Sequence, residues 1–500
     1  MKRNQRLIVL CFLFVSILSG CQVLKSSDTS TSADNVPEGL QVLGDVENAG
    51  DLTLCWDTLT KETVAFDGND YTAVAADTLI EAFSPLIGVH EIAMIADDGF
   101  MVKVPYDTLK DTYIGYQEEK GWCYLSEKHP VNARVKNIRE IIVISEDDSA
   151  IGKSGLNIVT QESNIHLSLG EILAGSYESI AFLDGKSNLD GLEINVMKRK
   201  KCIRLSDVLA NTGSACAVSS LLIMDKEGQH DYEQVSDGYF EVENQKINYI
   251  SMDQHIVIRD VYGAVINPPA VSNRDNFDDS VHYLEKGQKV VTLFLDGFSY
   301  TQYEAIKTAH PEWFLSQLAS VQMATTVYKP VTNAGFAAII TGEVPAVNGV
   351  YDRSYRTVNC ETIFDRAESM GLSSALIEGD IKILDIQTKT YLNTDDDGDG
   401  YTDDEVFERA KTLLESGGQP DYLLVHFHGI DDAGHDYGRF HEKTLGRIER
   451  IDGYVRQLSA MMTPDTKVII TADHGMHDTQ DGGDHGDFRY EDLIVPYAID

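Results

Sequence analysis

Seven side chains in the last two fifths of the chain have the types needed for a two-metal hydrolase site. They are Asp296, Thr332, Asp431, His435, Asp473, His474 and His485. Two divalent ions about 4 Å apart can hold the attacking and leaving oxygens of a displacement at phosphorus, and carboxylate oxygens with imidazole nitrogens suit zinc in that role. The aspartates and histidines supply enough ligands for two such ions.

Apolar, β-rich runs precede most of these residues. KVVTLFL comes directly before Asp296, DYLLVHF shortly before Asp431, and KVIITA before Asp473. Such runs predict buried strands, and open α/β sheets bind ligands at the carboxyl ends of their strands. His435 lies four residues after Asp431, so one helical turn, or a tight loop at Gly434, would direct both side chains toward one ion.

Each of these residues also has an ordinary structural interpretation. Asp296-Gly297 alone is typical of a turn, and Asp473 with His474 alone is as typical of a solvated loop. Thr332 precedes the helical run AGFAAIIT, which makes it a candidate N-cap; that role is compatible with phosphate binding, because helix N-termini also bind anions. Three nearby histidines have no motif position, and we interpret them as core residues or neighbours of the ligands: His426, His428 and His477.

The ordered motifs around the seven residues resemble those of the alkaline phosphatase superfamily, and most closely its type I phosphodiesterase/nucleotide pyrophosphatase branch. In family order they are LFLDG, TNAGFAAIITG, DDAGHDYG, TADHGM and GDHG followed by EDLIVP. The resemblance implies an α/β fold, a three-layer α/β/α catalytic domain over residues 285–500. We predict its helices at Tyr300–His310, Glu361–Met370, Glu405–Ser416 and Glu442–Met462.

The resemblance also implies roles for the residues. One ion would be held by Asp431, His435 and His485. The other would be held by Asp296, Asp473 and His474. Thr332 would be the nucleophile, activated by the second ion. The expected activity is hydrolysis of phosphate esters, as a phosphodiesterase or a phosphomonoesterase, through a phosphothreonine intermediate, with zinc as the expected metal.

Arg353 departs from the family pattern in a way that bears on the substrate. It stands where nucleotide pyrophosphatases resemble one another in having an asparagine near the phosphoryl oxygens. A guanidinium there can bind phosphate through two parallel hydrogen bonds. Because added positive charge favours a dianionic monoester over a monoanionic diester, Arg353 favours phosphomonoesterase activity.

Two other functions fit the same fold. A catalytically silent surface lipoprotein that only binds ligands would be expected to have a broken site, whereas all seven positions are intact. Transferases and mutases of related folds carry further domains inserted in the catalytic region, and too few residues separate Arg353 from Asp431 for a large insertion. The leaving group stays open.

The first residues predict export. Three cations precede an apolar stretch from Leu7 to Leu18, a pattern typical of a secretory signal rather than a membrane span. Leu18-Ser19-Gly20-Cys21 resembles a bacterial lipobox, so we interpret residues 1–20 as a lipoprotein signal peptide, Cys21 as the lipidated residue and residues 21–41 as a flexible tether. Acyl chains would then hold the protein on the extracytoplasmic face of the membrane. An uncleaved short anchor would also leave it outside.

The composition argues against nucleic acid as a partner. The formal net charge is −39, and loss of the three signal cations would make it more negative still. Such a field repels polyanions, and no basic stripe is present. Small phosphate esters remain suitable substrates, and no pattern predicts an oligomeric state.

Two β-rich (α+β) accessory modules are predicted between tether and catalytic domain, over residues 42–148 and 160–268. ADTLIEAF and IREIIVIS of the first correspond to RLSDVLA and YISMDQHIVI of the second. An internal duplication is therefore one interpretation, and we expect a spacer or binding role. Asn267-Pro268-Pro269 and the polar run Ser272–Ser280 predict the linker to the catalytic domain.

The acidic run DDDGDGYTDDE resembles a calcium-binding loop. Its carboxylates stand at ligand positions or one place away from them: Asp395, Asp397, Asp399, Asp403 and Glu405. Val406 stands where a bidentate glutamate is expected, so Glu405 would have to replace it. A structural Ca²⁺ site and a solvated acidic insertion both stay open.

The cysteines do not form a disulfide framework. Beyond Cys21 they are irregularly spaced and odd in number: Cys55, Cys123, Cys202, Cys216 and Cys360. Pairing of Cys55 with Cys123 and of Cys202 with Cys216 stays open beside free thiols. None stands in the Cys/Ser-x-Pro-x-Arg setting of sulfatase nucleophiles, so a sulfatase loses its main support.

Overall fold

The computed structural model describes residues 39–86, 88–145, 155–175, 178–213, 216–252 and 256–500. The predicted signal peptide, the lipidated Cys21 and most of the predicted tether lie outside these residues. Among the described residues, no helix is both long and apolar enough to cross a membrane.

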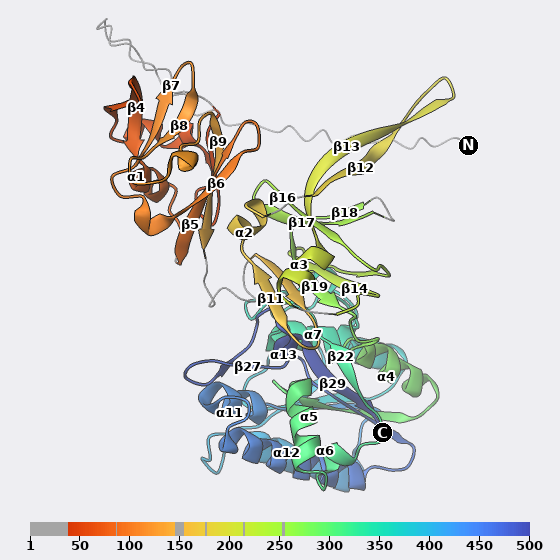
Figure 1. The fold of residues 1–500 in the computed structure, drawn as a ribbon. Helices are drawn as coiled ribbons and strands as arrows, with labels where there is room; N and C mark the ends of the chain where they lie inside the picture. The colour runs from red at the N-terminus through yellow and green to blue at the C-terminus, as the bar shows by residue number, and fades with distance from the viewer. Residues whose placement is uncertain (1–38, 87, 146–154, 176–177, 214–215, 253–255) are drawn as a thin grey trace, which may run out of the picture. The chain divides into compact units, whose positions relative to one another are not determined.

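An eight-stranded sheet forms the centre of the carboxyl-terminal domain (Figure 1), in the order β20-β22-β29-β26-β21-β25-β23-β24. Its strands are β20 (Val271–Ser272), β21 (Lys289–Leu295), β22 (Val321–Thr325), β23 (Ser374–Glu378), β24 (Lys389–Leu392), β25 (Tyr422–Phe427), β26 (Thr466–Thr471) and β29 (Ile494–Ile499). All neighbours are parallel except β29, which runs antiparallel to β22 and β26. The central strands are nearly continuous apolar runs, as expected for strands covered on both faces.

Helices cover this sheet in two groups. α4 (Asp275–Glu285), α7 (Thr332–Thr341) and α9 (Ile363–Ser369) contact one another. α10 (Asp403–Glu415), α11 (Gly429–Tyr437) and α12 (Glu442–Met461) form the second group, with α5 (Tyr300–Ala309) and α6 (Phe314–Gln317) beside them. Two single turns, α8 (Pro345–Asn348) and α13 (Tyr490–Leu493), complete the domain. The predicted three-layer α/β/α fold is confirmed, and so are the four predicted helices to within two residues at each end.

The polar run predicted as a linker forms part of the domain instead. It contains β20 and most of α4. Asn276 is fully buried, donating from Nδ2 to the Ile339 carbonyl and accepting from the Thr292 hydroxyl through Oδ1. Because these polar groups have partners inside the protein, their polarity misled the prediction, and the catalytic sheet begins upstream of residue 285.

The first accessory module, module 1, contains two sheets. The order of one is β2-β1-β9-β5-β6 and that of the other is β3-β4-β7-β8. The elements are β1 (Gln41–Gly44), β2 (Gly50–Asp51), β3 (Glu62–Phe66), β4 (Asn69–Ala75), α1 (Ala76–Glu81), β5 (Val89–Ala96), β6 (Met101–Pro105), β7 (Tyr113–Gln117), β8 (Gly121–Leu125) and β9 (Ile138–Ser145).

The second accessory module, module 2, also contains two sheets, ordered β11-β10-β19-β14-β15 and β12-β13-β16-β17-β18. The elements are β10 (Leu156–Val159), β11 (Asn164–Leu167), α2 (Leu169–Leu173), β12 (Glu178–Leu189), β13 (Leu192–Arg204), α3 (Leu205–Asn211), β14 (Leu221–Asp225), β15 (His230–Glu233), β16 (Tyr239–Glu243), β17 (Lys246–Ser251), β18 (Ile256–Ile258) and β19 (Val261–Ile266).

The two modules share one topology. In each first sheet the strand that opens the module pairs in parallel with the strand that closes it, β1 with β9 and β10 with β19, and the other pairs are antiparallel. α1 and α3 each follow the second strand of the other sheet. The duplication itself stays a prediction. In the shared topology β19 takes the place of IREIIVIS (β9), whereas YISMDQHIVI contains the end of β17 and all of β18.

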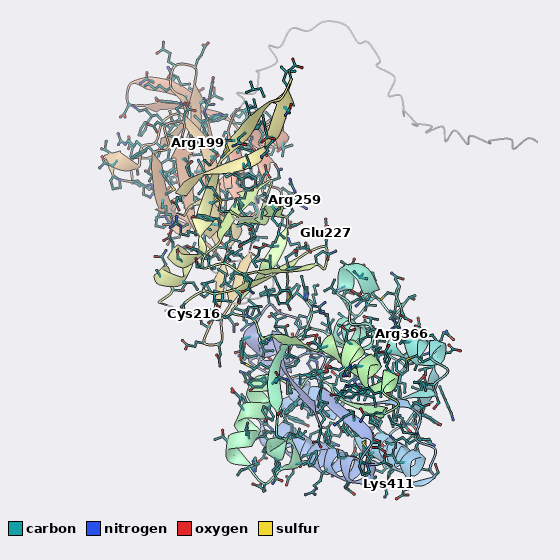
Figure 2. All side chains as sticks on the ribbon, turned by 90° about the vertical axis from the view of Figure 1, so that its right-hand side faces the viewer. Arg199, Cys216, Glu227, Arg259, Arg366 and Lys411 are labelled. Carbon is teal, nitrogen blue, oxygen red and sulfur yellow. The ribbon has the colours of Figure 1, made fainter. Side chains whose placement is uncertain are left out.

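Module 2 packs on the catalytic domain through an apolar cluster that contains Leu222, Val265, Phe488 and Leu493. Asn164 fixes the same contact, because its amide donates to Glu491 and accepts from the backbone N–H of Tyr490. The five cysteines beyond Cys21 are all free thiols, among them the half-buried Cys216 labelled in Figure 2.

Candidate two-metal site

The sheet topology brings the predicted residues to one edge. Asp296 directly follows β21, while Asp431 and His435 lie on α11, just beyond β25. Asp473 and His474 follow β26. Because β21, β25 and β26 are parallel, their carboxyl ends open on the same side. Thr332 opens α7, and His485 follows the short strand β28 (Gly483–Asp484), which pairs with β27 (His477–Asp478).

Three groups of side chains at this edge have ligand atoms close enough to share an ion, and Asp296 with His426 and His428 forms one of them. The other two contain the predicted ligands. One consists of Asp431, His435 and His485 and the other of Asp296, Asp473 and His474, each with its ligand atoms within 4.8 Å of one another. These are the two ligand sets that the family resemblance implies. The groups adjoin, since the rings of His474 and His485 stack with centroids 3.7 Å apart.

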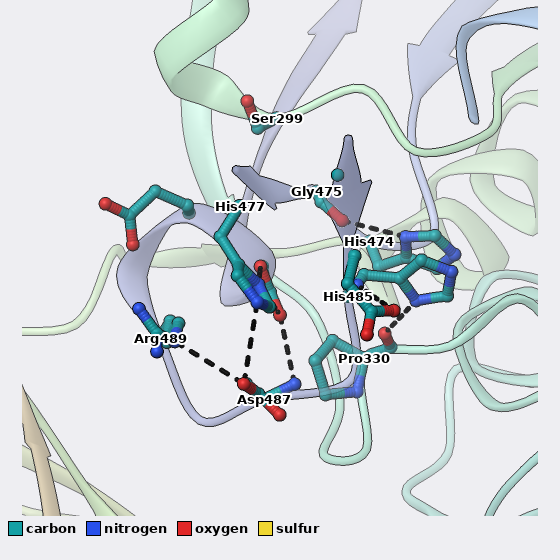
Figure 3. A network of polar contacts seen from close by, with 12 residues as sticks. Ser299, Pro330, His474, Gly475, His477, His485, Asp487 and Arg489 are labelled. Carbon is teal, nitrogen blue, oxygen red and sulfur yellow. Dashed lines mark hydrogen bonds and ion pairs between the residues drawn. The ribbon is translucent and has the colours of Figure 1, made fainter. Parts of the chain in front are cut away.

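Backbone carbonyls orient all three histidines. His474 Nδ1 lies 2.9 Å from the Gly475 carbonyl and His485 Nδ1 lies 2.9 Å from the Pro330 carbonyl (Figure 3). His435 Nδ1 lies 3.1 Å from the Gly483 carbonyl. A carbonyl only accepts, so each Nδ1 carries a proton and each Nε2 faces the site. Metal-binding histidines are held in this way. The hydrogen bond with Asp431 raises the pKa of His435 to about 9, so this imidazole is also protonated on Nε2 at neutral pH.

The site brings acceptors face to face. His474 Nε2 lies 3.2 Å from Asp473 Oδ2 and 3.4 Å from Asp296 Oδ1, and His485 Nε2 lies 3.6 Å from Asp431 Oδ1. These three carboxylate oxygens are buried without a hydrogen-bond partner. Buried acceptors in such an arrangement are costly unless a cation lies between them. Three carboxylates and three Nε2 atoms therefore fit two divalent ions of the zinc type.

The pKa values of the carboxyls reflect the same crowding. Burial, together with the charges of Asp296 and Asp431, raises the pKa of Asp473 well above its usual range. Burial also acts to raise the pKa of Asp296, but hydrogen bonds from His426 and His428 outweigh it and hold that pKa well below the usual range. Burial and the neighbouring His485 lower the pKa of His474 to about 4, which keeps this imidazole neutral.

Thr332 is aimed at the site and does not cap its helix. The N-cap of α7 is Val331, so Thr332 is the first helical residue and the N-cap interpretation is wrong. Its Oγ1 lies 3.3 Å from His474 Nε2. Since that nitrogen is an acceptor, the hydroxyl donates to it and so lies beside the group that contains Asp296.

Three further residues complete the surroundings of Asp296. His426 Nε2 and His428 Nδ1 lie 2.9 and 3.2 Å from Asp296 Oδ2. Glu378, at the end of β23, is fully buried and lies 3.7 Å from His426 Nδ1. The interpretation of the two histidines as neighbours of the ligands is confirmed. Glu378 was not predicted, although a carboxylate that closes an apolar strand was an available signal. His477 instead contacts Asp492 at 2.9 Å.

Arg353 reaches the site from an exposed position. Its Nη2 lies 2.6 Å from His485 Nε2. This nitrogen belongs to the first ligand group, so the guanidinium and a cation would compete for the same lone pair.

The acidic loop divides between two environments. Asp395, Asp397 and Asp399 lie within reach of one ion, and so do Asp397, Asp404 and Glu405. Asp403 lies apart from both groups. It is fully buried at the start of α10 and accepts hydrogen bonds from the backbone of His428 and Gly429, which ties the loop to the turn before α11.

Comparison with known proteins identifies the domain. Residues 382–495 match the family model of type I phosphodiesterase / nucleotide pyrophosphatase. The carboxyl-terminal domain is thus similar to the type I phosphodiesterase branch of the alkaline phosphatase superfamily. The predicted resemblance is thereby confirmed, and the chemistry common to this family is that of phosphate esters.

Individual relatives match only parts of the chain. GPI ethanolamine phosphate transferase 3 of Homo sapiens is 31% identical over 84 residues, 17% of this chain and 7% of that protein. The enzyme of the same name from Eremothecium gossypii is 38% identical over 66 residues, 13% of this chain and 6% of that protein. The chain thus spans less than a tenth of the length of these curated relatives.

Solved structures match weakly. Phosphonoacetate hydrolase from Sinorhizobium meliloti 1021 has a TM-score of 0.30 at 19% identity, over 38% of this chain and 57% of that one. Murine ectonucleotide pyrophosphatase / phosphodiesterase 5 has a TM-score of 0.31 at 19% identity, over 39% and 58%.

Proposed function

We propose that this protein is an extracytoplasmic two-metal enzyme that hydrolyses phosphate esters through a phosphothreonine intermediate on Thr332. The observation that carries the proposal is the meeting of both ligand groups and the Thr332 hydroxyl at one sheet edge. The match of residues 382–495 to the type I phosphodiesterase / nucleotide pyrophosphatase model supports it.

The residues divide the work. Asp431, His435 and His485 would hold one ion and Asp296, Asp473 and His474 the other. When bound, such ions stabilise a threonine alkoxide and neutralise charge on the phosphoryl group. His426 and His428 fix the orientation of the Asp296 carboxylate through Oδ2 and leave Oδ1 free for the site.

In the first step the Thr332 hydroxyl releases its proton to solvent and Oγ1 attacks phosphorus. The bond from phosphorus to the leaving oxygen breaks, and the departing oxygen takes a proton from solvent. α7 begins at Thr332, so its N-terminal backbone N–H groups would face a phosphoryl group held at Thr332. In the second step water attacks the phosphothreonine and restores the threonine hydroxyl. Arg353 can turn from His485 to the phosphoryl oxygens, because its side chain is exposed.

A second candidate function is group transfer. The curated relatives are named as ethanolamine phosphate transferases. Transfer differs from hydrolysis only in the second step, where an acceptor hydroxyl replaces water. ³¹P NMR of a reaction containing a phosphodiester and an excess of an alcohol distinguishes the two, since transfer yields a new diester and hydrolysis a monoester.

The activity is tested with soluble protein that begins after Cys21. We expect zinc-dependent release of para-nitrophenol from para-nitrophenyl phosphate or from the para-nitrophenyl ester of thymidine 5′-monophosphate. Thr332→Ala should lower turnover about a thousandfold or more, because the nucleophile is lost, whereas Thr308→Ala, an exposed threonine on α5, should not. Unchanged turnover in Thr332→Ala would refute a phosphothreonine route. The ratio of monoester to diester turnover tests the role proposed for Arg353.

The lipid anchor is a separate part of the proposal. It rests on the lipobox-like residues that end at Cys21. We expect the full chain in the membrane fraction of the producing bacterium and incorporation of labelled palmitate. Cys21→Ser should abolish the label, and a label that persists in this variant would contradict lipidation at Cys21.

A further inference from the structure

A cavity of about 610 Å³ lies between module 2 and the catalytic domain. On the module 2 side it is lined by the β14–β15 hairpin, which carries Glu227 (Figure 2), and by Tyr262 of β19. On the catalytic side it is lined by Tyr328, Lys329 and the segment 351–355. The Ala346 N–H donates to the Gly228 carbonyl at 3.2 Å and holds the hairpin in place.

The two catalytic segments that line the cavity also carry residues of the metal site. Tyr328 and Lys329 directly precede Pro330, whose carbonyl orients His485, and Thr332 follows two residues later. In the other segment Arg353 stands between Asp352 and Tyr355. The Asn333 amide donates to the Tyr355 carbonyl at 2.8 Å and joins both segments next to the nucleophile. Two short chain segments therefore connect the cavity lining with the metal site.

The aromatic lining is not shaped as a slot for a flat base. Tyr262 and Tyr328 pack on each other with centroids 4.1 Å apart and planes at 54°. Tyr351 and Tyr355 pack edge to face at 5.4 Å. Each ring thus already has an aromatic neighbour, and the pairs offer apolar edges and phenol hydroxyls in place of two parallel faces.

The charged lining excludes a polyanionic group. Asp225, Glu227 and Asp352 face the cavity together with Lys226 and Lys329. Lys226 is paired with Asp260 at 3.1 Å, so the cavity has no positive excess for a second phosphate. It has many hydrogen-bonding groups of both kinds, which suits a ring that carries several hydroxyls.

We propose that this cavity binds the organic group of the phosphate ester, that this group is a polyhydroxylated ring such as a sugar or cyclitol, and that module 2 is thereby a specificity-determining part of the enzyme. The proposal rests on the hydrolase activity proposed above and adds the substrate class. Tyr262 supplies the apolar contact, and the carboxylates and lysines bind the hydroxyls.

The test compares para-nitrophenyl diesters that differ only in the second group: methyl phosphate, glucose 6-phosphate, thymidine 5′-monophosphate and phosphocholine. We expect kcat/KM of the holoenzyme to be highest for the glucose diester. Tyr262→Ala should lower that value at least tenfold and change the value for the methyl diester less than twofold. Glu227→Ala, on the exposed hairpin, should act in the same direction without disturbing the apolar contact. Tyr232→Ala, an exposed tyrosine of the same module outside the cavity, is the matched control.

Two results would overturn the proposal: no preference for the glucose diester over the methyl diester, or an equal loss on both diesters in Tyr262→Ala and Glu227→Ala. A preference for the thymidine diester or the choline diester would also refute the polyhydroxylated ring. The ligand of the cavity would then be a nucleoside or a cationic group. If the wild-type protein hydrolyses no diester, calorimetry with the methyl diester of glucose 6-phosphate decides separately. If the wild-type protein binds this diester and Tyr262→Ala does not, the cavity proposal is supported and the proposed hydrolase activity is refuted. If the wild-type protein does not bind it, the cavity proposal is refuted.

Discussion

At the scale of the residue, the site brings electron-rich oxygen and nitrogen atoms close together. A bound cation would relieve the repulsion between them. Three imidazole Nε2 atoms and three carboxylate oxygens without a hydrogen-bond partner point into the site from the ends of strands and from α11. A carbonyl behind each imidazole accepts from its Nδ1 and so keeps its Nε2 turned toward the site. Ions that bind such a preformed site stabilise the folded state by the free energy of binding.

Removal of divalent ions is therefore expected to destabilise the protein. Treatment of zinc-loaded protein with a chelator should lower the melting temperature by about 5 °C or more, because ligand at a thousand times its Kd contributes about 4 kcal/mol. Differential scanning calorimetry measures the change, and added zinc should reverse it. Asp431→Asn should respond less to zinc than the wild-type protein, and identical melting curves with and without zinc would contradict the site.

At the scale of the element, α7 positions the nucleophile by close approach to the end of β26. Gly335, one turn into α7, makes this possible, since a Cβ at this position would lie 2.4 Å from the Asp473 carbonyl oxygen and 2.7 Å from its Cβ. α7 and the residue that follows β26 thus meet at Gly335. A larger side chain there would push them apart and move Thr332 relative to His474.

Gly335→Ala should separate these two elements. We expect a loss of about 1–3 kcal/mol in the free energy of unfolding, from overpacking, together with a fall in zinc-dependent turnover. Gly446→Ala is the matched control, because its Cβ would meet nothing within 4 Å on the exposed side of α12; it should gain about 0.5–1 kcal/mol from lower backbone entropy. Urea unfolding and turnover measure both effects, and equal behaviour of the two variants would disprove the close approach.

The sequence predicted the strands that end at Asp296, Asp431 and Asp473, because parallel buried strands are long apolar runs followed by the functional residue. It did not predict α4, whose buried Asn276 reads as a loop residue until its partners on α7 and β21 are known. Glu378 and the cavity at Tyr262 were not predicted from the sequence for a related reason. Their partners are distant in the chain, and no local pattern connects them.

At the scale of the whole molecule, module 2 packs on the catalytic domain. Leu222 of β14 is fully buried in the cluster with Phe488 and Leu493, which follow His485 closely in the chain. Ile92 of β5, the strand with the same place in the topology of module 1, is equally buried. The neighbouring Ala93 packs in a cluster with Ala174 of module 2. β14 thus lies against the segment that follows His485, whereas the cluster at β5 joins module 1 to module 2.

Substitution of Leu222 and of Ile92 should distinguish the roles of the two modules. Leu222→Ala and Ile92→Ala should each cost about 2–5 kcal/mol, the usual loss for a large buried side chain. Only Leu222→Ala should also raise the zinc concentration needed for half-maximal activity, since it loosens the segment behind His485. Zinc titrations of turnover measure this, and equal zinc requirements in both variants would count against a supporting role for module 2.

The shared topology also places two equivalent turns in different surroundings. The turn after β14 borders the cavity, whereas the corresponding turn after β5, Asp97–Phe100, is exposed along its length. Because exposed loop tips tolerate changes, we expect the turn after β5 to accept substitutions and short insertions without loss of activity. The turn after β14 should accept fewer of them, because each one alters the wall of the cavity.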